Sequence, residues 1–131
     1  MSALSILLDT NAYSRYLTHR EWLWHVQYAD RIYLPLIAVA ELKAGFLKGS
    51  KALENQQVLQ KFCATPRVSI LCPDPSTATH YATVFDQLRR NGTPIPVNDI
   101  WIAALALQHG LHLCTSDAHF DHIPQLLRAQ P

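Results

Sequence analysis

Four of the ten acidic residues in this chain lie in, or directly after, stretches of apolar residues. They are Asp9, Glu41, Asp99 and Asp117. Burying an unpaired carboxylate is costly, so each of these groups must gain a proton, a partner or a metal ion in the folded protein. Any fold of this sequence must supply such partners, and a hard cation held by several carboxylates meets the requirement.

The composition predicts one folded domain over residues 1–131. The chain is 49% hydrophobic and 16% charged, which argues against disorder. A net charge of +1 argues against a strongly basic nucleic-acid coat, but leaves room for a local basic groove. Three cysteines without C-x-x-C spacing predict reduced thiols and a cytoplasmic protein. We expect no signal peptide and no membrane span, because the first residues lack a basic region and the longest apolar run is short.

Short apolar runs alternate with segments of helical pattern along the chain. The expected strands cover residues 4–8, 32–34, 68–71 and 111–114. The expected helices cover residues 12–18, 20–30, 36–47, 52–64, 76–90 and 98–109. The tail from residue 119 fits either a short helix or a late strand. This alternation predicts an α/β protein with a mainly parallel sheet flanked by helices.

Two helix starts carry residues that favour capping. Thr10 and Asn11 precede the helix expected at 12–18, and Ser76 or Thr77 opens the helix expected at 76–90. We therefore expect these side chains to cap their helices.

Two of the four acids follow predicted strands. Asp9 comes after residues 4–8, and Asp117 comes after residues 111–114. Parallel sheets place their binding sites at the carboxyl ends of the strands. We therefore expect Asp9 and Asp117 to lie at the same edge of the sheet.

The other two acids lie on predicted helices. Glu41 shares a helix face with Ile37, Ala44 and Gly45, so we expect it to point toward the core. Asp99 lies in the first turn of its helix, where the helix dipole favours a carboxylate. Each acid also fits a purely structural role, as a cap, a turn residue or a helix-edge glutamate. Their occurrence together favours a shared site.

Several ionised carboxylates held close together raise one another's pKa. Mg²⁺ or Mn²⁺ relieves this repulsion and prefers oxygen ligands. One or two such ions can activate a water and stabilise the leaving oxygen of a phosphodiester. The histidines have no zinc-site spacing; His119 and His122 fit either a position flanking the acidic site or the solvated position usual for loop histidines.

Four short motifs carry a family resemblance. In chain order they are Leu7-Leu8-Asp9-Thr10-Asn11, Ala40-Glu41-Leu42, Asp99-x-x-Ile102-Ala103-Ala104 and Thr115-x-Asp117-x-His119-Phe120. In this order and at these spacings they resemble the PIN-domain ribonucleases, and are most similar to the VapC-type toxins of toxin–antitoxin pairs. The resemblance implies a three-layer α/β/α sandwich and a Mg²⁺- or Mn²⁺-dependent endoribonuclease.

The resemblance also implies roles for individual residues. Asp9, Glu41, Asp99 and Asp117 would form the acidic set. Within it, Asp9 and Asp99 would bind the metal directly, Asp117 would bind it directly or through water, and Glu41 would orient the attacking water. Asn11 and Thr115 would be polar supports for these acids. Asp121 has no implied role, and Ser116 stands where many family members carry a larger or basic residue, which bears on substrate contacts.

The partners implied by the resemblance are an RNA substrate, a second copy in a homodimer and a cognate antitoxin that blocks the site. Trp101 and Leu105 share a helix face that fits either a partner surface or packing under neighbouring helices. Trp22, Trp24 and Tyr28 fit either a groove for an antitoxin helix or a core. The cations that could contact RNA are Arg15, Lys43, Lys48, Lys51, Arg89 and Arg90.

The main alternative is a non-enzymatic, Mg²⁺-binding, receiver-like signalling module, which has a similar length and the same alternation of elements. Such a module normally has paired acids after its first strand and a lysine after its last. Here Asp9 stands alone, and no lysine follows residues 111–114. A further alternative is a PIN fold that has lost catalysis and only binds RNA or a partner. The presence of all four acids argues against it.

Overall fold

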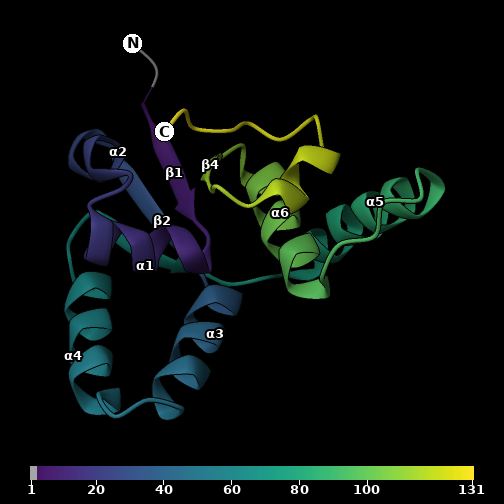
Figure 1. Cartoon of the computed structure of the whole chain (residues 1–131). Coiled ribbons are helices and arrows are strands. Elements are labelled where there is room, and N and C mark those ends of the chain that lie inside the picture. Colours follow the sequence, from purple (N-terminus) through teal and green to yellow (C-terminus); the bar gives the residue numbers. More distant parts are fainter. Residues whose placement is uncertain (1–2) are drawn as a thin grey trace.

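The computed structural model describes residues 3–131, which form a four-stranded sheet in the order β3-β2-β1-β4 (Figure 1). The strands are β1 (Ser5–Leu8), β2 (Arg31–Pro35), β3 (Val68–Leu71) and β4 (His112–Cys114). All three pairs of neighbouring strands are parallel. The expected parallel sheet is confirmed, and its carboxyl ends share one edge.

Helices cover both faces of this sheet (Figure 1). They are α1 (Thr10–His19), α2 (Leu23–Tyr28), α3 (Leu36–Leu47), α4 (Ala52–Cys63), α5 (Pro75–Arg90), α6 (Val97–His109) and the 3₁₀ helix η1 (Ala118–His122). The first four contribute to one buried cluster, and α5, α6 and η1 contribute to the other. The three-layer α/β/α sandwich is therefore confirmed.

Strand β1 divides its side chains between the two layers. Ile6 and Leu8 belong to the cluster under α1–α4, whereas Leu7 belongs to the cluster under α5 and α6, and all three are fully buried. Successive side chains of a strand point to opposite faces, so a central strand between two helical layers must be apolar throughout. This explains the uninterrupted apolar run that ends at Asp9.

The corner between α1 and α2 differs from the expected helix over residues 20–30. Arg20 and Trp22 have left-handed backbones, with φ of 55° and 65°, so residues 20–22 form a turn. A left-handed residue cannot continue an α-helix. Helix α2 therefore begins at Leu23 and ends at Tyr28, and is shorter at both ends than the predicted helix over residues 20–30.

Both predicted helix caps were wrong by a few residues. Asp9, and not Thr10 or Asn11, caps α1, with Oδ1 accepting from the Ala12 N–H at 2.7 Å. Asp74, and not Ser76 or Thr77, caps α5: its Oδ1 accepts the Thr77 N–H at 3.1 Å, and its own backbone N–H donates to Thr77 Oγ1 at 2.9 Å. Aspartate competes well with serine and threonine at this position, and Pro75 fits the first turn.

The tail combines the two conformations expected for it. After η1 the chain returns along the free edge of β4, where the Leu113 N–H donates to the Leu127 carbonyl at 2.8 Å. The Ala129 N–H donates to the Leu113 carbonyl at 3.0 Å, which forms an isolated parallel bridge at Arg128. This short pairing covers part of an edge that would otherwise be unpaired.

Leu105 packs inside the molecule, and Trp101, which is partly buried, packs against α5. Leu105 is fully buried, and the Trp101 ring lies 4.4 Å from that of Tyr81 on α5. The aromatic residues of α2 behave differently, because Trp22 is buried while Trp24 and Tyr28 are about 60% exposed, at 59% and 64%. Within residues 3–131, no helix has both the length and the apolar character needed to cross a bilayer.

Candidate active site

Asp9 lies at the carboxyl end of β1 and is only 5% exposed. One carboxylate oxygen, Oδ1, caps α1, and the other, Oδ2, accepts from the Thr115 hydroxyl at 2.5 Å. Because a strand ends at Asp9 and a helix begins after it, the carboxylate is fixed by both elements. This accounts for an acid directly after a buried strand.

The segment after β4 brings Asp117 beside Asp9. Thr115 Oγ1 donates to Asp9 and accepts the Asp117 N–H at 3.0 Å. Asp117 in turn caps η1, because its Oδ1 accepts the His119 N–H at 2.9 Å. The ends of β1 and β4, which are neighbours in the sheet, therefore place both acids at one edge, as the sequence predicts.

Asp99 reaches the same place from the first turn of α6, and its side chain is 18% exposed. Its neighbour Ile100 is buried in the core, which fixes the orientation of the turn. The amino terminus of a helix favours a carboxylate through its dipole, which is one reason for an acid at this position.

Glu41 does not point toward the core, as we expected from its helix pattern, but is exposed at the cleft. The buried face of α3 carries Ala38, Val39 and Leu42 instead. Ala44 and Gly45, which share the predicted face with Glu41, are also exposed, so their small size did not indicate burial. Glu41 Oε1 accepts from the Thr10 hydroxyl at 2.7 Å, which ties α3 to the start of α1.

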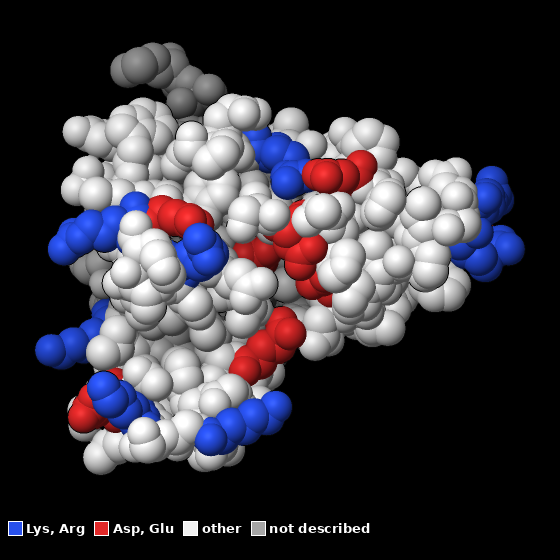
Figure 2. Space-filling view, viewed as in Figure 1, with Lys and Arg blue, Asp and Glu red and all other residues white. Residues whose placement is uncertain are grey.

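The four acids line one cleft of about 420 Å³ at the carboxyl edge of the sheet. Figure 2 shows acidic side chains gathered near the centre of this face, with basic side chains toward its rim. The cleft is lined by Asp9, Thr10, Asn11, Glu41, Asp99, Asp117 and His119, together with residues 96–98 and Ile102. Thr115 does not line the cleft but donates a hydrogen bond to Asp9, which does. The predicted site residues therefore all line the cleft or contact a residue that lines it.

Burial and mutual repulsion act on the two most enclosed acids. Burial is the main cause that raises the pKa of Asp9, with the charges of Asp99 and Asp117 adding to it and the Thr115 hydrogen bond opposing it. Burial also raises the pKa of Asp99, and the charges of Asp117 and Glu41 add to this effect. A bound cation would favour the charged form of each group. The electrostatics and the oxygen-rich donor set thus fit a hard divalent cation.

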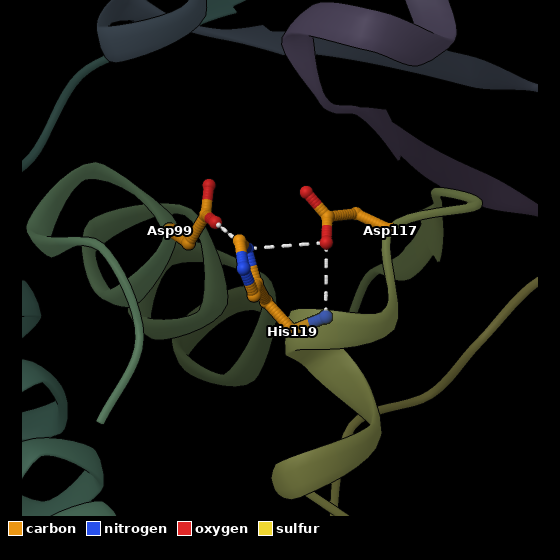
Figure 3. Close-up of side chains that lie close together, drawn as sticks. All are labelled: Asp99, Asp117 and His119. Carbon is orange, nitrogen blue, oxygen red and sulfur yellow. Dashed lines mark hydrogen bonds and ion pairs between the residues drawn. The ribbon is translucent and has the colours of Figure 1, made fainter. Parts of the chain in front are cut away.

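His119 is a residue of the site to which the sequence motifs gave no role. Its ring lies between Asp99 and Asp117 (Figure 3). Nδ1 is 2.9 Å from Asp99 Oδ2 and 3.1 Å from Asp117 Oδ1. The spacing Asp117-x-His119 is a signal for this proximity, because both residues belong to one tight turn, but only the fold shows that the ring faces the acids.

Other predicted candidates lie away from the cleft. Asp121 pairs with Arg128 at 3.0 Å and so ties η1 to the tail. His122 is not among the residues that line the cleft, in contrast to His119. The cations Arg15, Arg89 and Arg90 form ion pairs with nearby acids on the surface.

A larger cleft adjoins the acidic one. It has a volume of about 1090 Å³ and lies between the α1–α2 corner and the tail. Thr115 and Ser116 form part of its wall, so it begins within two residues of Asp117. Arg20 and the exposed ring of Trp24 also line it.

Comparisons with known proteins agree with this geometry. The PIN domain family model matches residues 6–126. Ribonuclease VapC1 of Haemophilus influenzae strain R2866 is 33% identical over 100 residues, which cover 74% of this chain and 72% of that protein. Toxin FitB of Neisseria gonorrhoeae is 34% identical over 122 residues, covering 86% of this chain and 87% of FitB.

Solved structures show the same similarity over nearly the whole chain. VapBC-1 from nontypeable Haemophilus influenzae superposes with a TM-score of 0.86 at 26% identity, covering 97% of this chain and 98% of that one. DNA-bound VapBC from Salmonella typhimurium superposes with a TM-score of 0.85 at 27% identity, covering 96% of this chain and 97% of that one. The chain therefore belongs to the PIN domain family. Within that family it is of the VapC type.

Proposed function

We propose that this protein is a metal-dependent endoribonuclease that acts as the toxin of a toxin–antitoxin pair and consists of one PIN domain over residues 1–131. The observation that carries the proposal is the convergence of Asp9, Glu41, Asp99 and Asp117, from four separate segments, in one cleft. The similar proteins named ribonuclease VapC add the activity and the RNA substrate.

The residues suited to hold a cation are those whose oxygens face the cleft. Asp9 and Asp99 are proposed as direct ligands, and Asp117 as a ligand directly or through water. A Mg²⁺ or Mn²⁺ ion bound there would activate a water and offset the negative charge that develops on the phosphate. The carboxylates alone would repel an RNA phosphate, so the acidic cleft suits this substrate only with a cation.

The remaining polar residues have proposed roles in positioning. Thr115 holds Asp9 through a short hydrogen bond, and Asn11 lines the same cleft. Glu41 also lines the cleft and is held by Thr10, so its carboxylate can accept a hydrogen bond from the attacking water and orient it. The larger cleft beside Ser116 gives an RNA strand room to continue past the acids, with Trp24 and Arg20 offering stacking and phosphate contacts.

The proposal extends to a cognate antitoxin and a second copy of the chain. The similar structures include the toxin–antitoxin complexes VapBC and FitAB. On this chain, the exposed rings of Trp24 and Tyr28 on α2 give an antitoxin helix an apolar surface. Analytical ultracentrifugation of the purified protein, alone and with the candidate antitoxin, tests both partners.

The activity is tested by incubating purified protein with total cellular RNA in Mg²⁺, Mn²⁺ or EDTA. Asp99→Asn serves as the inactive variant, and Glu54→Gln, an exposed acid on α4, serves as its matched control. We expect discrete products that require the metal, vanish with Asp99→Asn and persist with Glu54→Gln. Cleavage that is equal in Asp99→Asn and wild type would overturn the proposal.

A further inference from the structure

His119 adds a nitrogen to a site whose other donors are oxygens. Asp99, Asp117 and His119 each offer one ligand atom, and these three atoms lie within 4.8 Å of one another (Figure 3). They come from two different elements, the first turn of α6 and the start of η1. Two carboxylates and one imidazole at this spacing can meet on a single ion.

The position of His119 is fixed by its surroundings. Its backbone N–H donates to Asp117 Oδ1 at 2.9 Å, which holds the start of η1 against the acid. The next residue, Phe120, is 1% exposed and anchors the turn in the core. The Asp117 N–H donates to Thr115 Oγ1, and the Thr115 hydroxyl donates to Asp9. The turn that carries the His119 ring is therefore connected to Asp9 by hydrogen bonds. A ring held by a rigid turn is better suited to ligation than one on a mobile loop.

The acidic cleft is lined by four carboxylates and one imidazole. Among the described residues 3–131, neither lysine nor arginine lines it, and His119 is its one nitrogen base. A lysine or arginine could only balance the charge, because both are donors without a free lone pair. A neutral imidazole can instead offer a ring nitrogen to a metal, with the hydrogen on the other nitrogen.

We propose that His119 is a metal ligand, through Nδ1, and that this mixed oxygen and nitrogen site selects a first-row transition-metal dication such as Mn²⁺ over Mg²⁺. The inference rests on the proposed function in that it concerns the cation of that site. Mg²⁺ strongly prefers oxygen ligands and retains its waters, whereas transition-metal dications accept imidazole readily. Replacing an oxygen donor by an imidazole therefore shifts selectivity away from Mg²⁺.

The competing role for His119 is that of a cationic partner for the two aspartates. In that role the ring would offset repulsion between Asp99 and Asp117 and would compete with any metal. Its removal would then leave Mn²⁺ binding unchanged or strengthen it. The two roles thus predict opposite changes in affinity.

The test measures metal binding directly, with Mn²⁺ and Mg²⁺ as probes, and does not require RNA. Isothermal titration gives both affinities for the wild type, His119→Asn and His122→Asn. Asparagine keeps a polar group close to the position of Nδ1 but removes the ring nitrogen. His122 is the matched control, since it is an exposed histidine of the same 3₁₀ helix outside the cleft.

We expect His119→Asn to lower the Mn²⁺ affinity by about 10–100-fold, the range seen when groups that tune a metal site are removed. The Mg²⁺ affinity should change by less than about threefold, because Mg²⁺ gains little from imidazole. His122→Asn should leave both affinities as in the wild type. Equal losses for both metals, or tighter Mn²⁺ binding in His119→Asn, would overturn the inference.

A spectroscopic measurement on the wild type guards against misfolding of the variant. Electron spin echo measurements on bound Mn²⁺ should show coupling to a ¹⁴N nucleus of the imidazole. Bound Mn²⁺ without this coupling would overturn the inference and leave the nuclease proposal intact. Conversely, Mn²⁺ with the ¹⁴N coupling but no RNA cleavage would contradict the nuclease proposal and support His119 as a ligand, and failure to bind either ion would contradict both.

Discussion

Thr115 Oγ1 donates to Asp9 Oδ2 at 2.5 Å and joins residues that are 106 positions apart in the chain. The same hydroxyl oxygen accepts the Asp117 N–H at 3.0 Å. One side chain thus fixes two acids, at the ends of neighbouring parallel strands. The geometry of the cleft depends on this threonine as well as on the carboxylates.

Thr115→Val should weaken both the fold and the metal site. The change keeps the volume but leaves the buried Asp9 oxygen without its donor, which costs about 1–3 kcal/mol of unfolding free energy. Metal affinity should fall by about 10–100-fold, because Asp9 loses the group that orients it. Urea denaturation and Mn²⁺ titration measure the two effects.

Thr115→Ser is the control for this change, because it keeps the hydroxyl and loses only a methyl group. It should bind Mn²⁺ almost as tightly as the wild type. Wild-type affinity in Thr115→Val would show that the hydrogen bond to Asp9 is not needed for the site.

Glu41→Gln should separate catalysis from stability. The side chain is exposed, and a glutamine oxygen can still accept from the Thr10 hydroxyl, so the unfolding free energy should stay close to that of the wild type. The cleavage rate should fall by about 10²–10⁴-fold if Glu41 orients the attacking water. Rate measurements at saturating metal test this, and an unchanged rate would remove Glu41 from the mechanism.

Asp74→Ala should destabilise the protein more than Ser76→Ala, because Asp74 is the cap of α5. The hydrogen bond from Gln108 is the main cause that lowers the pKa of Asp74 below its ordinary value of 3.8, with the Thr77 N–H adding to it. A depressed folded pKa contributes stability above the unfolded pKa, and this contribution is lost as the pH falls through the folded value.

The difference in melting temperature between wild type and Asp74→Ala should therefore be largest at neutral pH and should become smaller as the pH falls below about 4. Thermal unfolding at pH 7 and at acidic pH measures it. If Ser76→Ala lowered the melting temperature more than Asp74→Ala, Ser76 would be the cap of α5, as the sequence suggested.

Leu105→Ala should lower the stability of the single chain without changing its association. Leu105 is fully buried in the cluster under α5 and α6, so its truncation should lower the unfolding free energy by about 2–5 kcal/mol. The state of association should not change, because the side chain does not reach the surface. A shift from dimer to monomer with unchanged chain stability would contradict this packing.

The sequence predicted well whatever depends on local periodicity. The strand at residues 68–71 and the helix at 36–47 have the predicted bounds, and the strand ends place Asp9 and Asp117 at one edge as expected. These features follow from patterns within a few neighbouring residues. The order of strands in the sheet needed the folded structure.

The sequence predicted poorly the features decided by tertiary contacts. The face of α3 that carries Glu41 has the small and apolar residues expected of a core face, yet Glu41, Ala44 and Gly45 are exposed and Glu41 lines the cleft. The turn at Arg20 and Trp22, where both backbones are left-handed, contains no glycine from which it could be predicted. The contact of His119 with Asp99 joins residues 20 positions apart, and only the packing of η1 against α6 creates it.

One series of variants tests whether the acids of this cleft cleave RNA. Cleavage rates would be compared for Asp9→Asn, Asp99→Asn, Asp117→Asn and Asp121→Asn at fixed Mn²⁺ concentration. Asp121 is the matched control, because it lies four residues from Asp117 but faces Arg128 and is 64% exposed. We expect the first three variants to lose cleavage while remaining folded, and Asp121→Asn to cleave as the wild type does. Cleavage that survives in Asp9→Asn and Asp99→Asn, or that is lost equally in Asp121→Asn, would overturn the proposed function.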